Sequence, residues 1–288
     1  VSGTYAVTAT SGDITDSGTL TITGAATFKT GADGSNIVLD SSSNAFSAAV
    51  TMIADAGGED FGNITFVDSA AIDFATSASS NGDLYINSST DGTVGGNLSV
   101  TATTGNITDT VALAVTGTTT LVTSADNGTI VLDVTTNAFT GALTITTNDS
   151  SGTDADVTID GGTTALIIAA STIDGDLTLT SGNASGITDS GTVTVGGNLS
   201  ATTDANAGVI NLGTMAVDGT IALTTNSTGA ATIVNDAALT FAASTVGGAL
   251  TATATTGNIT DSGALAITGT TTLVTSADNG TIVLDVTT

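Results

Sequence analysis

The chain has 288 residues, with 27 acidic side chains, one basic side chain (Lys29) and no Cys, Pro, His or Trp. A formal charge of −26 excludes a nucleic-acid interface, because one lysine cannot neutralise a run of phosphates. The absence of Cys and His excludes disulfides and thiolate or imidazole metal sites, and no stretch approaches the roughly 20 apolar residues of a transmembrane segment.

Along the chain, short segments with an apolar residue at every second position alternate with turns rich in Gly, Asn, Asp and Ser. LSVTAT (98–103) and LTIT (143–146) are examples. Such alternation predicts strands with one buried face, and the abundant Thr and Val suit strands better than helices. We therefore expect an all-β protein in which Leu98, Val100 and Ala102 point inward.

Internal repeats organise these segments. GDITDSGTLTITG (12–24) is echoed by GNITDTVALAVTG (105–117) and by GITDSGTVTVGG (186–197). The longer segment TGTTTLVTSADNGTIVLDVTT (116–136) returns unchanged at 268–288. Division at the closing glycines gives repeat units of roughly 21 to 24 residues, some of them with insertions.

Units of this length predict a parallel β-helix, or β-solenoid, of about 12 coils, with strands of successive coils ~4.8 Å apart. We expect residues 1–288 to form a single continuous array that is a fragment of a longer repetitive chain. Its interior would be a narrow stack of aliphatic side chains with little room for aromatic rings. The alternative is a string of tandem Ig-like β-sandwiches, but these do not repeat at ~22 residues.

The repeat pattern N-L-[ST]-V-T-A-T-x-G-x-I-T-D-S-G-A-L-x-[VI]-x-G resembles the haemagglutinin-type repeats of large secreted bacterial adhesins, which include filamentous haemagglutinin-like proteins and autotransporter passengers. The resemblance implies a right-handed parallel β-helix displayed in an extracellular fibre or at the bacterial cell surface. The acidic, Thr-, Ala-, Gly-, Asp- and Asn-rich composition is also similar to that of bacterial surface-layer proteins.

Clustered carboxylates are the only candidates for a metal site. Asp154, Asp156 and Asp160 lie in TDADVTID, and Asp174 and Asp176 lie in TIDGDL. Hard cations such as calcium prefer oxygen ligands of this kind. Asp also favours turns for its own conformational reasons, and neither a GGxGxD repeat nor an EF-hand loop is present. Calcium and simple turn formation therefore remain alternatives, and no other cofactor is expected.

Two functions are compatible with these features. In the first, the chain is a structural, non-catalytic shaft of a secreted bacterial adhesin or extracellular fibre, which contacts surface molecules of a host or another cell. In the second, it is a self-assembling subunit of a surface layer, sheath or filament, joined head-to-tail or laterally and possibly stabilised by calcium. We expect no enzyme activity, because the carboxylates recur from repeat to repeat whereas an active site is usually assembled once.

Overall fold

The computed structural model describes residues 2–54, 62–75, 83–87, 93–148, 150 and 154–286. These residues form strands and turns without a helix, and the strand pairings between them are parallel. The fold is thus an all-β parallel β-solenoid of about 12 turns, as predicted, and the alternative of antiparallel sandwiches is wrong. No helix in the described part of the chain could cross a membrane. Contacts divide the chain into two compact units, Val1–Ser150 and Ser151–Thr288.

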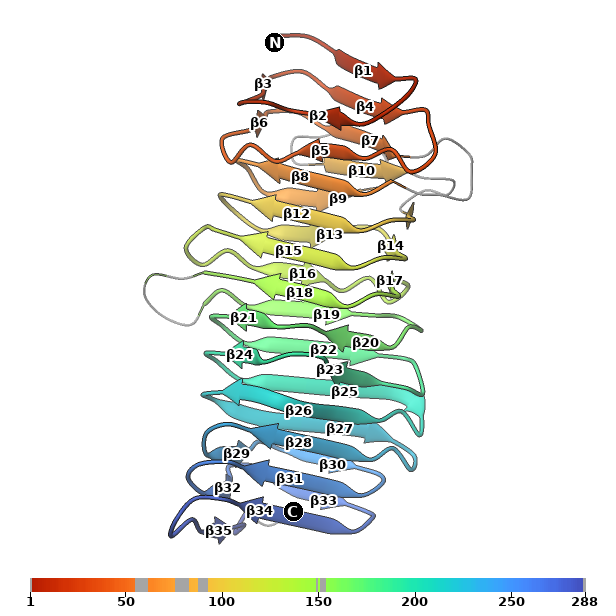
Figure 1. Ribbon diagram of the computed structural model, residues 1–288. Helices are drawn as coiled ribbons and strands as arrows, with labels where there is room; N and C mark the ends of the chain where they lie inside the picture. Colours follow the sequence, from red (N-terminus) through yellow and green to blue (C-terminus); the bar gives the residue numbers. More distant parts are fainter. Residues whose placement is uncertain are drawn as a thin grey trace. The chain divides into compact units, whose positions relative to one another are not determined.

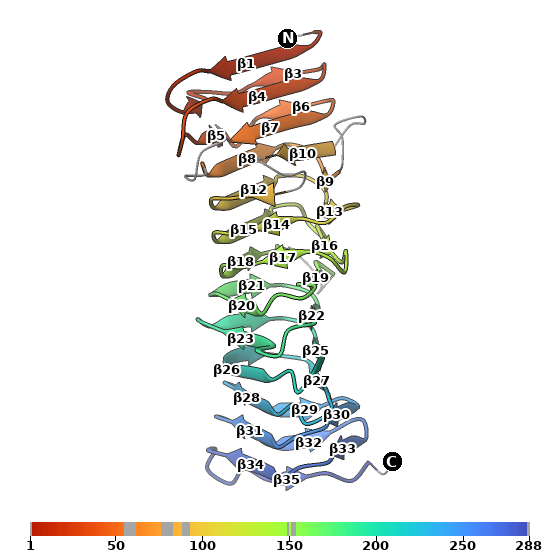
Figure 2. The ribbon, with the colours of Figure 1, turned by 90° about the vertical axis from the view of Figure 1, so that its right-hand side faces the viewer.

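The first unit contains eighteen of the described strands, which stack as successive rungs (Figure 1). They are β1 (Tyr5–Ala9), β2 (Ile14–Thr15), β3 (Thr21–Ile22), β4 (Ala26–Thr30), β5 (Ile37–Leu39), β6 (Ala45–Phe46), β7 (Val50–Ala54), β8 (Ile64–Asp68), β9 (Ile72–Phe74), β10 (Asp83–Asn87), β11 (Thr93–Val94), β12 (Leu98–Ala102), β13 (Ile107–Asp109), β14 (Ala114–Val115), β15 (Thr119–Thr123), β16 (Ile130–Leu132), β17 (Ala138–Phe139) and β18 (Leu143–Thr146). The first sheet follows the order β1-β4-β7-β10-β9-β13-β16, and the second follows β2-β5-β8-β12-β15-β18. Figure 2 shows β1, β4 and β7 above one another.

The second unit contains seventeen described strands arranged in the same way. They are β19 (Val157–Asp160), β20 (Leu166–Ile168), β21 (Ser171–Ile173), β22 (Leu177–Ser181), β23 (Ile187–Asp189), β24 (Val193–Val195), β25 (Leu199–Asn206), β26 (Ile210–Val217), β27 (Thr220–Asn226), β28 (Ala231–Asn235), β29 (Leu239–Phe241), β30 (Ser244–Val246), β31 (Leu250–Ala254), β32 (Ile259–Asp261), β33 (Leu265–Ile267), β34 (Thr271–Thr275) and β35 (Ile282–Val283). One sheet follows β19-β22-β25-β27-β29-β32-β35, and the other follows β20-β23-β26-β28-β31-β34.

The length of each coil is the sequence separation of residues that occupy equivalent positions in successive coils. Such residues, joined by hydrogen bonds at one corner, are 21 to 27 residues apart over most of the first unit. The corresponding separation in the second unit is 20 to 23 residues. One coil of the first unit is longer, because Ile64 pairs with Leu98 and Ile72 pairs with Ile107, which are 34 and 35 residues away. The structure therefore agrees with the repeat length expected from the sequence and extends its range.

Alternate residues of each strand point inward, as the period of two predicted. In β12, Leu98, Val100 and Ala102 are at most 1% exposed, while Ser99 and Thr101 are half-buried on the outer side. Each inward side chain stacks on its partner in the next coil, so that every coil covers the apolar surface of its neighbour. This burial is the main source of stability in a fold without disulfides.

The interior differs from the expectation of a purely aliphatic stack. Phe28, Phe46 and Phe66 of the first unit are at most 3% exposed, and together with Tyr5 they form a column of rings. Successive ring centroids lie 5.9, 6.1 and 5.1 Å apart in tilted or edge-on geometry. Aromatic rings fit because they stack from coil to coil along the axis, in an arrangement that aromatic pairs favour.

An additional strand shifts the repeat from one sheet to the other. β10 pairs with β7 on one side and with β9 on the other, so it enters the first sheet between strands of neighbouring coils. Before it, β4 lies in the first sheet, whereas β15, the equivalent strand of a later repeat, lies in the second. The same sequence motif therefore occupies either long side of a coil.

Burial differs between the two copies of the segment that is repeated at 116–136 and 268–288. In the first copy, Leu121, Ile130 and Leu132 are 0% exposed, because coils lie on both sides of them. In the second copy, Ile282 is 43% exposed and Leu284 is 41% exposed. Identical residues thus reach different degrees of burial according to the coils that cover them.

Candidate functional site

A ladder of polar side chains lies where the chain enters the strands of the second sheet in the first unit, a position that we call the corner of the coil. Each ladder residue stands immediately before the first buried residue of its strand. The Oδ1 atom of Asp13 accepts a hydrogen bond from the Asn36 backbone N–H, at 2.8 Å. Asn36, Asn63 and Asn97 each repeat this contact to the next coil, at 2.8, 2.7 and 2.8 Å, and the last donor is the N–H of Thr118. These oxygens satisfy backbone donors that the turn leaves free, so the corner residues join coil to coil.

The second unit has a corner ladder of the same kind, which precedes β19, β22 and β25 of the other sheet, and two of the predicted calcium ligands belong to it. The Oδ1 atom of Asp156 accepts from the Asp176 N–H at 2.8 Å, and the Oδ1 atom of Asp176 accepts from the Asn198 N–H at 2.6 Å. Asn198 in turn accepts from both the N–H and the hydroxyl of Thr220, each at 2.8 Å. Asp156 and Asp176 therefore act as hydrogen-bond acceptors between coils.

The other three calcium candidates lie apart from this ladder. Asp160 accepts from the Gly162 N–H at 2.7 Å and closes its own turn, while the main-chain oxygen of Asp154 accepts from the Asp156 N–H at 3.0 Å. Asp174 is half-buried in the turn that follows β21. Within the described ranges, no group of three or more carboxylates could hold a metal ion, so the structure does not bring the five candidates together as one site.

A second set of contacts between coils is made by the aspartate of each Ile-Thr-Asp motif. Its carboxylate accepts backbone N–H groups from the loop of the following coil. Asp109, which is 8% exposed, accepts the Asp133 N–H at 3.0 Å and the Asn137 side-chain amide at 2.7 Å. The side-chain Oδ1 atom of Asn137 then accepts the Leu113 N–H at 2.7 Å. Asp16 and Asn44 form the same network in an earlier coil, with an amide–carboxylate distance of 2.6 Å.

Two buried carboxylates, Asp109 and Asp68 at the end of β8, have a raised pKa. Burial raises the pKa of the Asp109 carboxyl above the usual value of 3.8, although the hydrogen bonds from Asn137 and the backbone oppose the shift. Burial likewise raises the pKa of Asp68, which is 3% exposed and accepts the Phe46 N–H at 3.0 Å. Each carboxylate accepts hydrogen bonds that hold a neighbouring strand or loop in place. The raised pKa is therefore explained by a structural role of the buried side chain.

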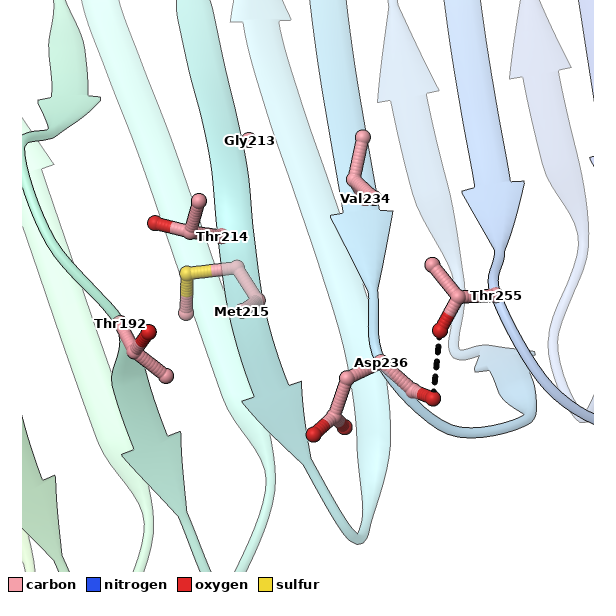
Figure 3. Close-up of a pocket in the computed structure, with 7 residues that line it drawn as sticks. All are labelled: Thr192, Gly213, Thr214, Met215, Val234, Asp236 and Thr255. Atoms are coloured by element: carbon pink, nitrogen blue, oxygen red, sulfur yellow. Dashed lines mark hydrogen bonds between the residues drawn. The ribbon is translucent and has the colours of Figure 1, made fainter.

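A shallow depression of about 280 Å³ interrupts the outer surface of the second unit (Figure 3). It forms at an irregularity in β26, where the pairing with β28 shifts register between Leu212 and Met215. Met215, 2% exposed, and Val234 provide an apolar floor, and Asp236 lies at the rim. Figure 3 shows the Asp236 carboxylate on the side of its strand that faces β26, and its main-chain oxygen hydrogen-bonded to Thr255.

The rim of the depression is rich in hydrogen-bond acceptors. The hydroxyl of Thr214 lies 2.5 Å from the Asp189 carboxylate and 2.9 Å from the main-chain oxygen of Gly191, so its proton is used within the protein. The hydroxyl of Thr255 donates to the main-chain oxygen of Asp236 at 2.6 Å. The Asp236 carboxylate accepts no hydrogen bond from the described residues and is exposed. Sequence reasoning missed this depression, because the register shift in β26 leaves no distinctive residue pattern.

Comparison with known families gives one match. A model of the family described as repeats of unknown function (DUF5649) matches residues 1–53, 61–146, 154–224 and 228–288. Comparisons with curated proteins and with solved structures find no match. The matched segments cover most of the coils described above, and the chain therefore belongs to the DUF5649 family of repeats.

Proposed function

We propose that this chain is a structural, non-catalytic shaft of a secreted bacterial cell-surface adhesin or extracellular fibre. The observation that carries the proposal is the corner ladder, in which the repeated Asp and Asn side chains bond to the next coil. Asp13, Asn36, Asn63 and Asn97 all have this role in the first unit. Polar groups that recur in successive repeats and join one coil to the next serve mechanical continuity between coils.

The composition of the outer surface supports the same proposal. Outward strand positions are mostly Thr and Ser, and the formal charge of −26 comes chiefly from carboxylates near the turns. High net charge of one sign opposes lateral aggregation of a repetitive β-protein. The single basic residue, Lys29, leaves one cleavage site for trypsin-like proteases, which suits a protein outside the cell.

The proposal is tested by location and by shape. Antibodies against the purified chain should label the surface of intact producing cells, and electron microscopy of the chain should show separate elongated particles. Labelling only after cell lysis, or compact particles, would contradict a surface shaft. A scan against small-molecule substrates does not bear on the shaft, because the proposal assigns no reaction to the chain.

Self-association into a surface layer, sheath or filament is the second candidate function, and the parallel pairing between coils favours it. Successive coils pair with one another through parallel strands, as β12 pairs with β15 and β15 with β18, so a coil of a second copy could pair in the same way. Strand edges with unpaired backbone groups pair readily with another chain. Filaments or sheets in the electron micrographs would favour this candidate over the shaft, and their loss in EDTA would point to calcium between subunits.

A further inference from the structure

We propose that the depression beside Met215 in the second unit is a binding site for one neutral hexose residue of a glycan. Such a site goes beyond the structural role proposed above, because a chain that binds no sugar could still be a shaft.

The size and lining of the depression suit one sugar ring. Its volume of about 280 Å³ lies just below the roughly 300 to 1,000 Å³ of pockets for drug-sized ligands. The half-buried Val234 side chain is the accessible apolar part of the lining against which the C–H face of a pyranose ring can pack, whereas Met215, 2% exposed, adds little surface to it.

The hydrogen-bonding character of the rim requires a ligand that donates. The hydroxyl protons of Thr214 and Thr255 are directed to protein oxygens, so these side chains offer lone pairs to the depression. The Asp236 carboxylate adds two acceptor oxygens at the rim, on the side of its strand that faces β26 (Figure 3). Two neighbouring hydroxyls of a hexose can donate to such a carboxylate, and hydrogen bonds to charged acceptors are the stronger ones.

The charge of the surroundings decides between sugar classes. The second unit contains no Lys or Arg, since the one basic residue of the chain is Lys29 in the first unit. Sialic acids, uronic acids and sulfated sugars would bring a negative charge close to Asp236 without a cation to offset it. The site therefore selects neutral sugars.

Gly213 provides a way to close the depression without disturbing the coil. A Cβ atom built at this glycine would meet only the Asp189 carboxylate, 3.9 Å away, which is an ordinary contact distance. A larger side chain at this position would extend over the floor. Gly213→Leu is therefore expected to fold and to block the site, whereas Asp236→Ala removes the acceptors and leaves the volume open.

The experiment is ligand-observed and protein-observed NMR on the full chain, with methyl glycosides of glucose, galactose and mannose as probes. Methyl glycosides mimic a residue linked within a glycan. We expect at least one of them to shift the resonances of Thr192, Met215 and Asp236. Asp236→Ala should weaken that binding about tenfold, as expected for loss of hydrogen bonds to a charged group. Gly213→Leu should abolish it.

The matched control is Asp218→Ala, which removes an exposed carboxylate of the same unit outside the depression. It should leave binding unchanged, and circular dichroism should show that all three variants are folded. The proposal is overturned if none of the neutral glycosides shifts these resonances at tens of millimolar. It is equally overturned if glucuronic acid or N-acetylneuraminic acid binds as well as they do, or if Gly213→Leu binds normally.

Discussion

Leu132 and Leu284 occupy the same position in the two copies of the repeated segment, yet their side chains are 0% and 41% exposed. The local sequence around them is identical, so any difference in their contribution to stability must come from the neighbouring coils. Truncation of each residue to alanine therefore measures what coil-on-coil burial contributes. The two variants, Leu132→Ala and Leu284→Ala, serve as controls for each other.

The expected magnitudes follow from the two environments. A fully buried leucine truncated within a packed core costs roughly 2 to 5 kcal/mol, because apolar contact is lost and a cavity remains. We expect Leu132→Ala to lower the free energy of unfolding by about 3 kcal/mol. Leu284 has less surface buried and its truncation leaves no closed cavity, so we expect about 1 kcal/mol.

Urea titration followed by circular dichroism gives the change in unfolding free energy for each variant. Repeat arrays can unfold in segments, so hydrogen exchange of the β13 and β16 amides should accompany the titration. Exchange in these strands should accelerate in Leu132→Ala and stay unchanged in Leu284→Ala. Equal losses of stability in the two variants would refute the reasoning, because local sequence and not coil stacking would then set the energetics.

Four further predictions can be checked on the same material. Asn137→Ala should destabilise the chain by about 2 kcal/mol in urea titration, because the Asp109 carboxylate and the Leu113 N–H both lose a buried partner; a loss below that of a typical surface variant would contradict this role. Thr101→Ser, on the outer face of β12, should change the free energy of unfolding by less than about 0.5 kcal/mol. The pKa values of Asp68 and Asp109 are raised in the folded state, so the folded chain binds these two protons more tightly than the unfolded chain does. The stability that this protonation contributes is complete below pH 3.8, and it is lost as the pH rises through the folded-state pKa values. Melting temperature should therefore increase as the pH falls from 7 toward 4, aided by neutralisation of the −26 charge, and a steady decrease over that interval would count against it. If calcium is not a structural component, EDTA should leave the melting temperature unchanged, whereas a fall that added calcium reverses would establish a metal site that these side chains alone do not reveal.

The sequence predicts the coil well, because the features that define it are local. Alternation of apolar and polar residues sets which side chains point inward, and the parity predicted for Leu98, Val100 and Ala102 is the one observed. The roles of the acidic side chains were harder to predict. Asp156 and Asp176 look like calcium ligands when they are close in sequence, yet each bonds to a backbone N–H of the next coil, 20 and 22 residues away. These contacts depend on the register between neighbouring coils. The sequence of a single repeat does not determine that register.

The irregularities of the repeat could not be predicted from the sequence either. The strand β10 resembles any other strand in its sequence, and only its pairing with both β7 and β9 identifies it as an addition to the sheet. The register shift in β26 that forms the depression at Met215 is similar, since it depends on how β28 aligns with it. Both features depend on contacts between neighbouring coils, so a one-dimensional pattern does not reveal them.

The migration of one motif between the two sheets has an evolutionary consequence. A segment that functions on either long side tolerates the gain or loss of half a turn upstream, because its corner residue finds an equivalent N–H whichever way it faces. The gene can then gain or lose segments that encode half a coil as well as a whole coil. The repeats that follow still fold, although each strand then lies in the other sheet. Unequal recombination within such a gene would yield foldable products more often than in an array confined to full turns.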